Sequence, residues 1–460
     1  VDELFTNFIE KDPKALFRRI DPDRAYPTFG DDSTEWENAP TSGKFYVKLR
    51  KNDSFGMWGN FVISYTGTDL AHIDRGLYGA NGYYVSPEVT SSGENKVMVG
   101  GFAAEPGTVA GRDEFRGTGG SLYFLRHQDI LIGSERLRIE VRDKDSLVVI
   151  GVKNLTPAID YDIDYIQGRI LLSEPLQSTA SDDLLVHDTS LSGNPVYLVS
   201  RYEYVPGFDE IDDVAVGGRA HYWINDQVKL GVTASQQDEA EVENSLNGVD
   251  LTLRKNAGTW LKAEYAKTEG DGSGALNSND GGFNFDALDP GSSTDNEADA
   301  YRIEGSTRLE EVFRGTRGSA SLYVQNREAG FSAPGQLTPT DVSQIGGKLN
   351  IAITDRSSLN VKADSRDQKD SINVAAADAD VDYVLDQNWR LSAGGRFDTR
   401  EDNSADVPVT QIQGDRFDVA FEATYDSQSN WLAYGFTQAT VNATGNREDN
   451  NRVGAGGQIR

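Results

Sequence analysis

The stretch RLSAGGRF, residues 390–397, carries two different faces. In an extended strand, alternate side chains point to opposite sides. One side then presents arginine, serine, glycine and arginine, and the other presents leucine, alanine, glycine and phenylalanine. The charged side needs water and the apolar side needs cover, so the stretch raises the question of which solvent this chain folds in.

The same alternation recurs from about residue 196 onward, in segments of roughly 8 to 12 residues that are typical of two-faced strands. Examples are QVKLGVTAS, GVDLTLRK, KLNIAIT and RFDVAFEATY. Some segments are joined by short turns such as Asn225-Asp226, and others by longer polar stretches. These longer stretches cover 236–246, 267–298, 327–343, 366–373, 398–414 and 440–450. Short turns at one end and long loops at the other are typical of outer-membrane barrels.

The pattern therefore predicts an all-β fold, a transmembrane antiparallel β-barrel of roughly 16–20 strands with a small inserted β-module. The apolar side would face lipid, and the polar side would face a wet lumen. No run of 18 apolar residues occurs, so no transmembrane helix is expected. The alternative is a soluble antiparallel sheet with one solvated face. That alternative gives no reason for loop lengths to be sorted by end.

Composition excludes some classes of function. The net charge is −29, which argues against a nucleic-acid partner because phosphate binding needs a basic surface. The chain has no cysteine, so it has neither disulfides nor thiolate metal sites. Its 4 histidines are scattered along the sequence, which argues against a histidine-rich metal site.

The chain divides into four predicted regions. Residues 1–43 are a segment preceding the barrel, and 44–132 form the first barrel strands. Residues 133–195 form an inserted extramembrane β-module, because the apolar run at 147–150 breaks strict alternation. We expect this run to form the module core with Ile163, Ile170 and Leu172. Residues 196–460 are barrel strands in consecutive hairpins with long acidic loops.

Several motifs add a family resemblance. LTPAIDYDIDYIQGRILL, DPDRAYPTFGDDST, HIDRGLYGANGYY and AEPGTVAGRDEFRGTGGSLYFLR resemble segments of large Gram-negative outer-membrane surface proteins. The resemblance spans most of residues 20–270. It implies a long multidomain protein with a C-terminal barrel similar to those of porins and secretion translocons. The chain departs from the pattern in ending GAGGQIR, where such barrels usually close with an aromatic residue.

Motifs for catalysis are weak. The acids of DYDIDY, Asp160, Asp162 and Asp164, fall at alternate strand positions, which is typical of a solvated strand face. We therefore assign no catalytic residue, no metal ligand and no cofactor. The acidic segment 270–300 is the one candidate for binding a calcium ion. The residues that we expect to line the lumen share the polar side of their strands and are Lys229, Asp250, Arg254, Lys262, Glu264, Lys348, Lys362, Asp364, Arg390, Arg396, Asp418 and Glu422.

Two classes of function fit these features. The first is a porin-like channel or translocation pore for transport, with a lumen of mixed charge and no strong ion selectivity. The second is a structural or adhesive anchor for cell-surface domains with a closed lumen. Neither is an enzyme. The expected location is the Gram-negative outer membrane. The expected partners are the lipid bilayer and lipopolysaccharide, with other surface or periplasmic proteins as further candidates.

Overall fold

The computed structural model describes residues 45–65, 67–104, 108–181, 184–187, 193–205, 214–239, 242–270, 276–287, 297–333, 336–404 and 412–459. The predicted segment 1–43 lies outside these ranges. The described chain is nearly all β, and its helical element is the short 3-10 helix η3 (Leu309–Glu311). No helix in the described ranges is long and apolar enough to cross a membrane.

One 17-stranded sheet forms the wall of the fold. Its strands are β1 (Val47–Lys51), β2 (Ser54–Tyr65), β3 (Ile73–Val85), β4 (Val97–Ala104), β13 (Ala215–Trp223), β14 (Val228–Glu239), β15 (Val242–Asn256), β16 (Thr259–Glu269), β19 (Glu297–Arg308), β20 (Gly318–Arg327), β23 (Val342–Ala352), β24 (Ser357–Gln368), β25 (Ile372–Val384), β26 (Trp389–Asp402), β27 (Gly414–Asp426), β28 (Trp431–Ala443) and β29 (Arg452–Ile459). Each pairs antiparallel with the next in this order. The predicted fold class is confirmed, and the strand number falls within the predicted range.

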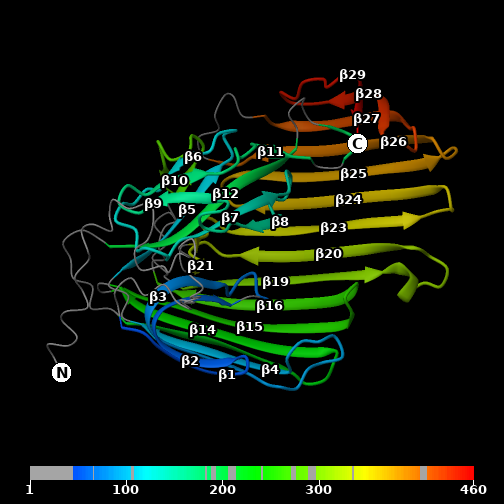
Figure 1. Ribbon diagram of the computed structural model, residues 1–460. Coiled ribbons are helices and arrows are strands. Elements are labelled where there is room, and N and C mark those ends of the chain that lie inside the picture. Colours follow the sequence, from blue (N-terminus) through cyan, green and yellow to red (C-terminus); the bar gives the residue numbers. More distant parts are fainter. Residues whose placement is uncertain are drawn as a thin grey trace, which may run out of the picture.

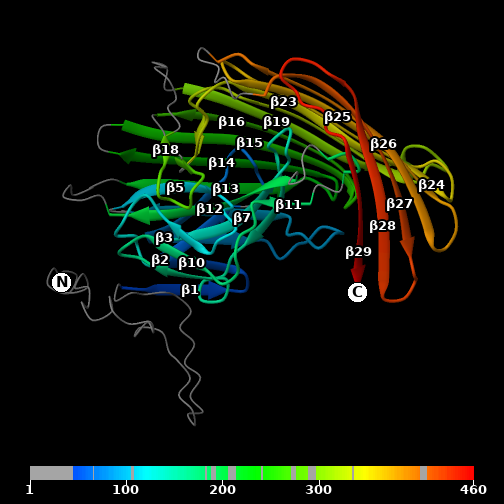
Figure 2. The ribbon, with the colours of Figure 1, turned by 90° about the horizontal axis from the view of Figure 1, so that it is seen from above.

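The sheet curls strongly but remains open (Figure 2). In the described part of the chain, no ladder joins β1 to β29, which form its two edges. The sequence predicted longer loops at one end of the strands than the structure has. Glu239 pairs with Val242, so most of 236–246 is strand, and β24 and β25 likewise extend through most of 366–373. These strand ends are rich in polar residues, which is why they resembled loops in the sequence.

The chain leaves the wall after β4 and returns at β13. Between them lie β5 (Val109–Arg116), β6 (Leu122–Phe124), β7 (Arg136–Arg142), β8 (Val149–Asn154), β9 (Tyr161–Asp164), β10 (Arg169–Leu172), β11 (Thr179–Ala180) and β12 (Asn194–Tyr204). We call residues 109–204 the inserted module. Strands β5, β12, β7 and β8 form one sheet, and β6, β10 and β9 form a second.

The predicted boundaries therefore need correction. The predicted first barrel region, 44–132, includes β5 and β6, which belong to the module, and the predicted hairpin region, 196–460, begins inside β12. The module is larger than 133–195. Strands β5 and β12 alternate as barrel strands do, so the sequence alone does not separate them from the wall.

The module has its own apolar core, which includes Phe115, Tyr123, Ile170 and Leu198. Ile170 and Leu172 lie in this core as expected. The apolar run at 147–150 does not, because Leu147, Val149 and Ile150 are at least 40% exposed. That run forms the β7–β8 turn and the start of β8, so its side chains point away from the packed face.

The module lies against the concave side of the curled wall (Figures 1 and 2). It covers the half of the wall nearest the long loops, while the short turns, such as the one after β23, lie at the opposite end (Figure 1). The sequence predicted a module outside the membrane that faces one aqueous side, and the structure places the module inside the curl of the wall. Buried contacts with residues in the middle of wall strands hold the module in the concavity.

Candidate functional site in the concave interior

The predicted lumen residues all lie on one face of the wall. Residues directly opposite in an antiparallel ladder point to the same side of the sheet. Asp250 lies directly opposite Glu264 on the neighbouring strand. Further along the sheet, cross-strand partners link Lys362, Asp378, Arg396 and Asp418 in that order. The other predicted residues share the parity of these partners. The sequence therefore assigned the faces of these strands consistently, including Arg390 and Arg396 of the RLSAGGRF stretch.

The opposite face is apolar and exposed. Leu230, Val249, Leu322 and Phe421 are 47%, 53%, 60% and 59% exposed. A soluble sheet buries its apolar face in a core, whereas a membrane barrel presents that face to lipid. Charged side chains are buried on the concave side and apolar side chains are exposed on the convex side. This inverted arrangement is the reason to regard the fold as a membrane barrel.

The predicted lumen residues fall into two groups by exposure. Six are buried, namely Asp250, Glu264, Lys362, Asp364, Arg396 and Asp418. Lys362 and Arg396 contact the module, whereas Glu264 accepts hydrogen bonds from Asp69 and Leu70 in the β2–β3 loop. Six closer to the short turns are partly or fully exposed, namely Lys229, Arg254, Lys262, Lys348, Arg390 and Glu422. The interior is therefore filled at one end of the strands and accessible at the other.

The β7–β8 turn of the module contacts the wall through two acids. The Nζ atom of Lys362 lies 2.6 Å from Oδ2 of Asp143 and 3.5 Å from Oδ2 of Asp145. Arg396 donates to both oxygens of Asp145, at 3.1 and 2.6 Å, and to Asp378 at 2.6 Å. Arg396 is fully buried. We call this set of contacts the turn lock.

Hydrogen bonds within the turn fix its shape. The Asp143 carboxylate accepts from the backbone N–H groups of Asp145 and Ser146, at 3.0 and 3.1 Å. The carbonyl of Ser146 in turn accepts from Nε2 of Gln344 in the wall, at 2.6 Å. Burial disfavours the charged form of Asp143, but the Lys362 ammonium outweighs it and lowers the pKa of Asp143. The turn therefore presents an ionised Asp143 carboxylate to the wall.

Two further contacts hold the module. Arg75 of β3 donates to both carboxylate oxygens of Glu203 in β12, at 2.8 and 3.0 Å. Near the other edge of the sheet, Gln438 accepts from the backbone N–H of His187 at 3.0 Å and donates to its carbonyl at 2.9 Å. Contacts therefore come from wall strands that lie far apart in the sheet.

A loop of the wall also joins the module sheet. Between β16 and β19, the strand β17 (Leu276–Ser278) pairs in parallel with β5, and β18 (Asp286–Ala287) pairs with β17. Phe285 of this loop packs against Phe115 of the module core, with ring centroids 5.9 Å apart. The predicted calcium segment, 270–300, includes this loop. Only residues 270, 276–287 and 297–300 of it are described, so the calcium site stays a prediction.

The contacts of the turn lock and of Glu203 are polar rather than apolar. The apolar cluster at the wall includes Phe61, Leu77 and Phe102, and it shares no residue with the core of the module. A buried ion pair adds little net stability relative to apolar packing, but losing one partner is costly. The turn lock and the Arg75–Glu203 contact therefore fix the position of the module against the wall. They do so without apolar packing between the core of the module and the apolar cluster of the wall.

Glycines on the concave face make room for some of these charges. A Cβ atom on Gly346 would lie within 2.1 Å of Oδ1 of Asp364, and one on Gly231 within 2.3 Å of Oδ1 of Asp250. Tyr323 donates to the same oxygen of Asp364 at 2.8 Å. The small residues within the polar stripes thus leave space for carboxylates on neighbouring strands.

The module also contains a buried hydrogen-bonded chain. Tyr202 donates to Asp113 at 2.7 Å, and Nδ1 of His127 lies 2.9 Å from the Tyr202 hydroxyl. Burial raises the pKa of Asp113 to about 6, despite the hydrogen bonds from Arg126 and Tyr202. Burial also lowers the pKa of His127 to about 4. Burial therefore shifts the titration of each group toward its neutral form.

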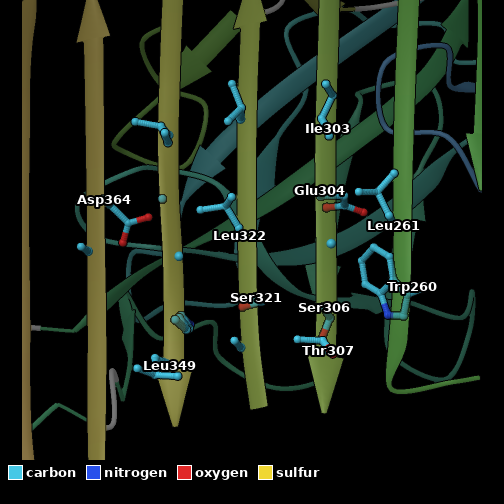
Figure 3. A pocket seen from close by; sticks show the side chains of 18 of the residues that line it. Trp260, Leu261, Ile303, Glu304, Ser306, Thr307, Ser321, Leu322, Leu349 and Asp364 are labelled. Carbon is cyan, nitrogen blue, oxygen red and sulfur yellow. The ribbon is translucent and has the colours of Figure 1, made fainter. Parts of the chain in front are cut away.

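The convex face is hollowed across β16, β19, β20 and β23. This groove has a volume of about 1480 Å³, and its apolar lining includes Leu261, Ile303, Leu322 and Leu349 (Figure 3). All four have the parity of the exposed apolar face. The residues that line the groove also include Arg254, Lys348 and Asp364 of the predicted lumen set.

The module side of the site was not predicted from the sequence. Asp143 and Asp145 lie in the segment RDKDS, and neither was among the residues predicted for the site. The wall partners Arg75 and Gln344 were missed as well. Two acids between two predicted strands were the only sign in the sequence that this turn could form ion pairs. Nothing in the sequence pattern indicates that these acids contact Arg396.

Comparisons with known proteins add little to this geometry. No protein-family description matches the chain, and no curated protein matches it. A solved structure that it resembles is OmpTdeltaL8, the loop L8 deletion mutant of OmpT, an outer membrane protein of Vibrio cholerae. The match has a TM-score of 0.25 and 11% sequence identity, and it covers 76% of this chain and 99% of that chain. A likeness at this level carries no argument about function.

One expectation is corrected at this point. The sequence led to the expectation that the chain is not an enzyme. That expectation is withdrawn. A fold does not by itself decide whether a protein is catalytic. The absence of a recognised motif was therefore an insufficient reason to exclude an enzyme.

The apolar convex face, the charged concave face and the antiparallel meander together define the class. The chain is a β-barrel protein of the outer-membrane type, with an open sheet and an inserted module in its concavity. The narrower resemblance to long multidomain surface proteins stays a prediction.

Proposed function

We propose that the protein is a plugged outer-membrane conduit, in which the inserted module closes the interior and must shift for passage. The observation that carries the proposal is the turn lock, in which Lys362 and Arg396 bind Asp143 and Asp145. The module has its own apolar core and is held to the wall by ion pairs, so it can move relative to the wall without unfolding. The accessible half of the interior near the short turns would form the vestibule.

The mixed charges of the vestibule support a conduit of low ion selectivity. Lys229, Lys262 and Arg390 are cationic, while Glu422 is anionic, and all are at least partly exposed. We also propose the Gram-negative outer membrane as the location, with bilayer lipid and lipopolysaccharide in contact with the apolar face. A calcium ion at 270–300 remains part of this proposal.

The test is single-channel recording in planar bilayers. The double variant Asp143→Asn/Asp145→Asn removes both charges of the turn lock. The control, Asp355→Asn, removes an exposed acid that pairs with Arg317 beside a short turn. We expect rare openings from the wild type and the control, and frequent stepwise conductance from the double variant.

A second candidate is an anchor for surface domains with a permanently closed lumen. The observation that favours it is β17, a strand in the loop between the wall strands β16 and β19, which pairs with β5 and so ties the module to the wall. Silence of both wild type and double variant in bilayers, with protein shown to be folded, would support the anchor and reject the conduit.

A further inference from the structure

The buried face between the module sheet and the wall holds more arginine than acid. On the module side, Arg112 and Arg142 both contact Glu114, and Arg138 and Arg142 both contact Glu140, at 2.5 to 2.8 Å. Register and strand parity place these five side chains on one face of β5 and β7, opposite the apolar core. Three arginines therefore share two carboxylates.

The wall adds a fourth arginine. Arg327 of β20 interacts electrostatically with Arg302, Arg112 and Arg142, and also with Asp69. Asp69 already pairs with Arg302 at 3.3 Å. Among the residues that the structure describes, no carboxylate forms an ion pair with Arg327, and its Nε atom is buried without a hydrogen bond.

Arg112 has guanidinium N–H groups that donate no hydrogen bond to the described residues. The residue is 5% exposed, and its Nε and Nη1 atoms are buried with no acceptor among the described residues. Nearby, burial and then the charges of Arg112 and Arg138 lower the pKa of Arg201 to about 9. This local excess of positive charge contrasts with the net charge of −29 for the whole chain.

We propose that Arg327, Arg112 and Arg142 bind a phosphate-type oxyanion between the module and the wall. The four arginines (112, 138, 142 and 327) and two glutamates (114 and 140) leave two positive charges unbalanced. A phosphate group carries about −1.5 to −2 charges near neutral pH and offers several acceptor oxygens. Planar guanidinium groups bind such oxygens in bidentate fashion. The anion would therefore bridge the two parts and stabilise the docked module.

The test uses the full chain purified in a detergent without phosphate. Calorimetric titration with inorganic phosphate is compared with chloride at equal ionic strength. We expect one saturable phosphate site in the wild type and an increase in unfolding temperature that chloride does not reproduce. Arg327→Gln should weaken phosphate binding by at least about tenfold. The control, Arg317→Gln, alters an exposed arginine at a short turn and should bind like the wild type.

Two further arms make the result decisive. If Arg327→Gln fails to fold, Arg327→Lys keeps the charge but loses the planar fork, and it should still bind more weakly than the wild type. Reconstitution in vesicles of phosphatidylcholine with and without phosphatidic acid separates a lipid headgroup from free phosphate. Saturable binding of inorganic phosphate or of phosphatidic acid supports the site if the Arg327 variants lose it. The ligand that binds shows whether the anion is free phosphate or a lipid headgroup. Absence of both, or equal binding by Arg327→Gln, overturns it.

Discussion

At the scale of single residues, Lys362 is the side chain on which most of the turn lock depends. It contacts Asp143, Asp145 and Asp364 within 3.5 Å and is only 9% exposed. Loss of this ammonium would leave Asp143 and Asp364 buried without its positive charge, whereas Asp145 would still pair with Arg396. Its neighbour on the same face of the ladder, Lys348, is exposed.

We predict that Lys362→Met will loosen the module. Removing one partner of a buried ion pair costs about 3–5 kcal/mol, since the remaining charge stays desolvated. The measurement is the rate of limited proteolysis within residues 109–204, together with the unfolding temperature. The matched control is Lys348→Met, which should change neither. Adding Asp143→Asn to Lys362→Met should restore part of the loss; no restoration would contradict the assignment of the turn lock.

At the scale of elements, the module sheet places Asp113 and His127 on the same hydrogen-bonded chain through Tyr202, and their pH effects oppose each other. The usual pKa of His127 is 6.5 and its folded value is about 4. Between these values the unfolded chain binds the proton and the folded module does not, so acidification destabilises. The usual pKa of Asp113 is 3.8 and its folded value is about 6. Between these values the folded module binds the proton, so acidification stabilises.

We therefore predict opposite pH profiles for two variants. His127→Phe keeps the ring that stacks on Tyr204, and should make the module more stable as pH falls from 6.5 to 4. Asp113→Asn should make it less stable over the same range. Thermal unfolding at several pH values provides the measurement, with the wild type lying between the two. Parallel profiles for both variants would show that these groups do not titrate as described.

Strand orientation is a second prediction at this scale. Leu391 and Phe421 are 42% and 59% exposed on the convex face, while Ser392 and Arg390 share the concave face. Because the chain has no cysteine, single cysteines at these positions can be labelled cleanly. The first pair should react with a lipid-soluble maleimide and the second pair with a water-soluble one. Mixed labelling within one strand would mean that the register is shifted by one residue.

At the scale of the whole molecule, the module is an insertion in an otherwise continuous meander. Ala104 at the end of β4 lies directly opposite Ala215 at the start of β13. The two wall strands are therefore already neighbours, and the module leaves and returns at adjacent points on the same edge of the interior. Its removal would not require any wall strand to change its partner.

We predict that replacing residues 105–214 with an Asn-Gly turn leaves a folded wall with an open interior. Two-residue turns of this type join adjacent antiparallel strands. The deletion should give steady conductance in bilayers and retain heat-modifiable migration in SDS. A shorter deletion, 133–176, removes β7 to β10 but leaves β5 and β12 without their core, and should aggregate. A wall that fails to fold only in the longer deletion would show that the module is part of the barrel.

The sequence by itself determined the faces of the strands. In RLSAGGRF and its repeats, a period of two fixes which side chains share a face, and antiparallel register carries that assignment from strand to strand. This is why Arg396 and Asp418 were correctly placed on the polar side. The length of the chain and the density of its strands likewise predicted the size of the sheet.

The tertiary structure alone decided what fills the concavity. Asp145 and Arg396 lie 251 positions apart and form an ion pair through a turn whose local sequence resembles any solvated loop. Strands β5 and β12 carry the same alternation as wall strands, so only their partners show that they belong to the module. Alternation encodes which side of a strand is polar, because it is a local property. The pairing of one polar surface with another depends on contacts between distant parts of the chain. These contacts form only once the sheet has curled.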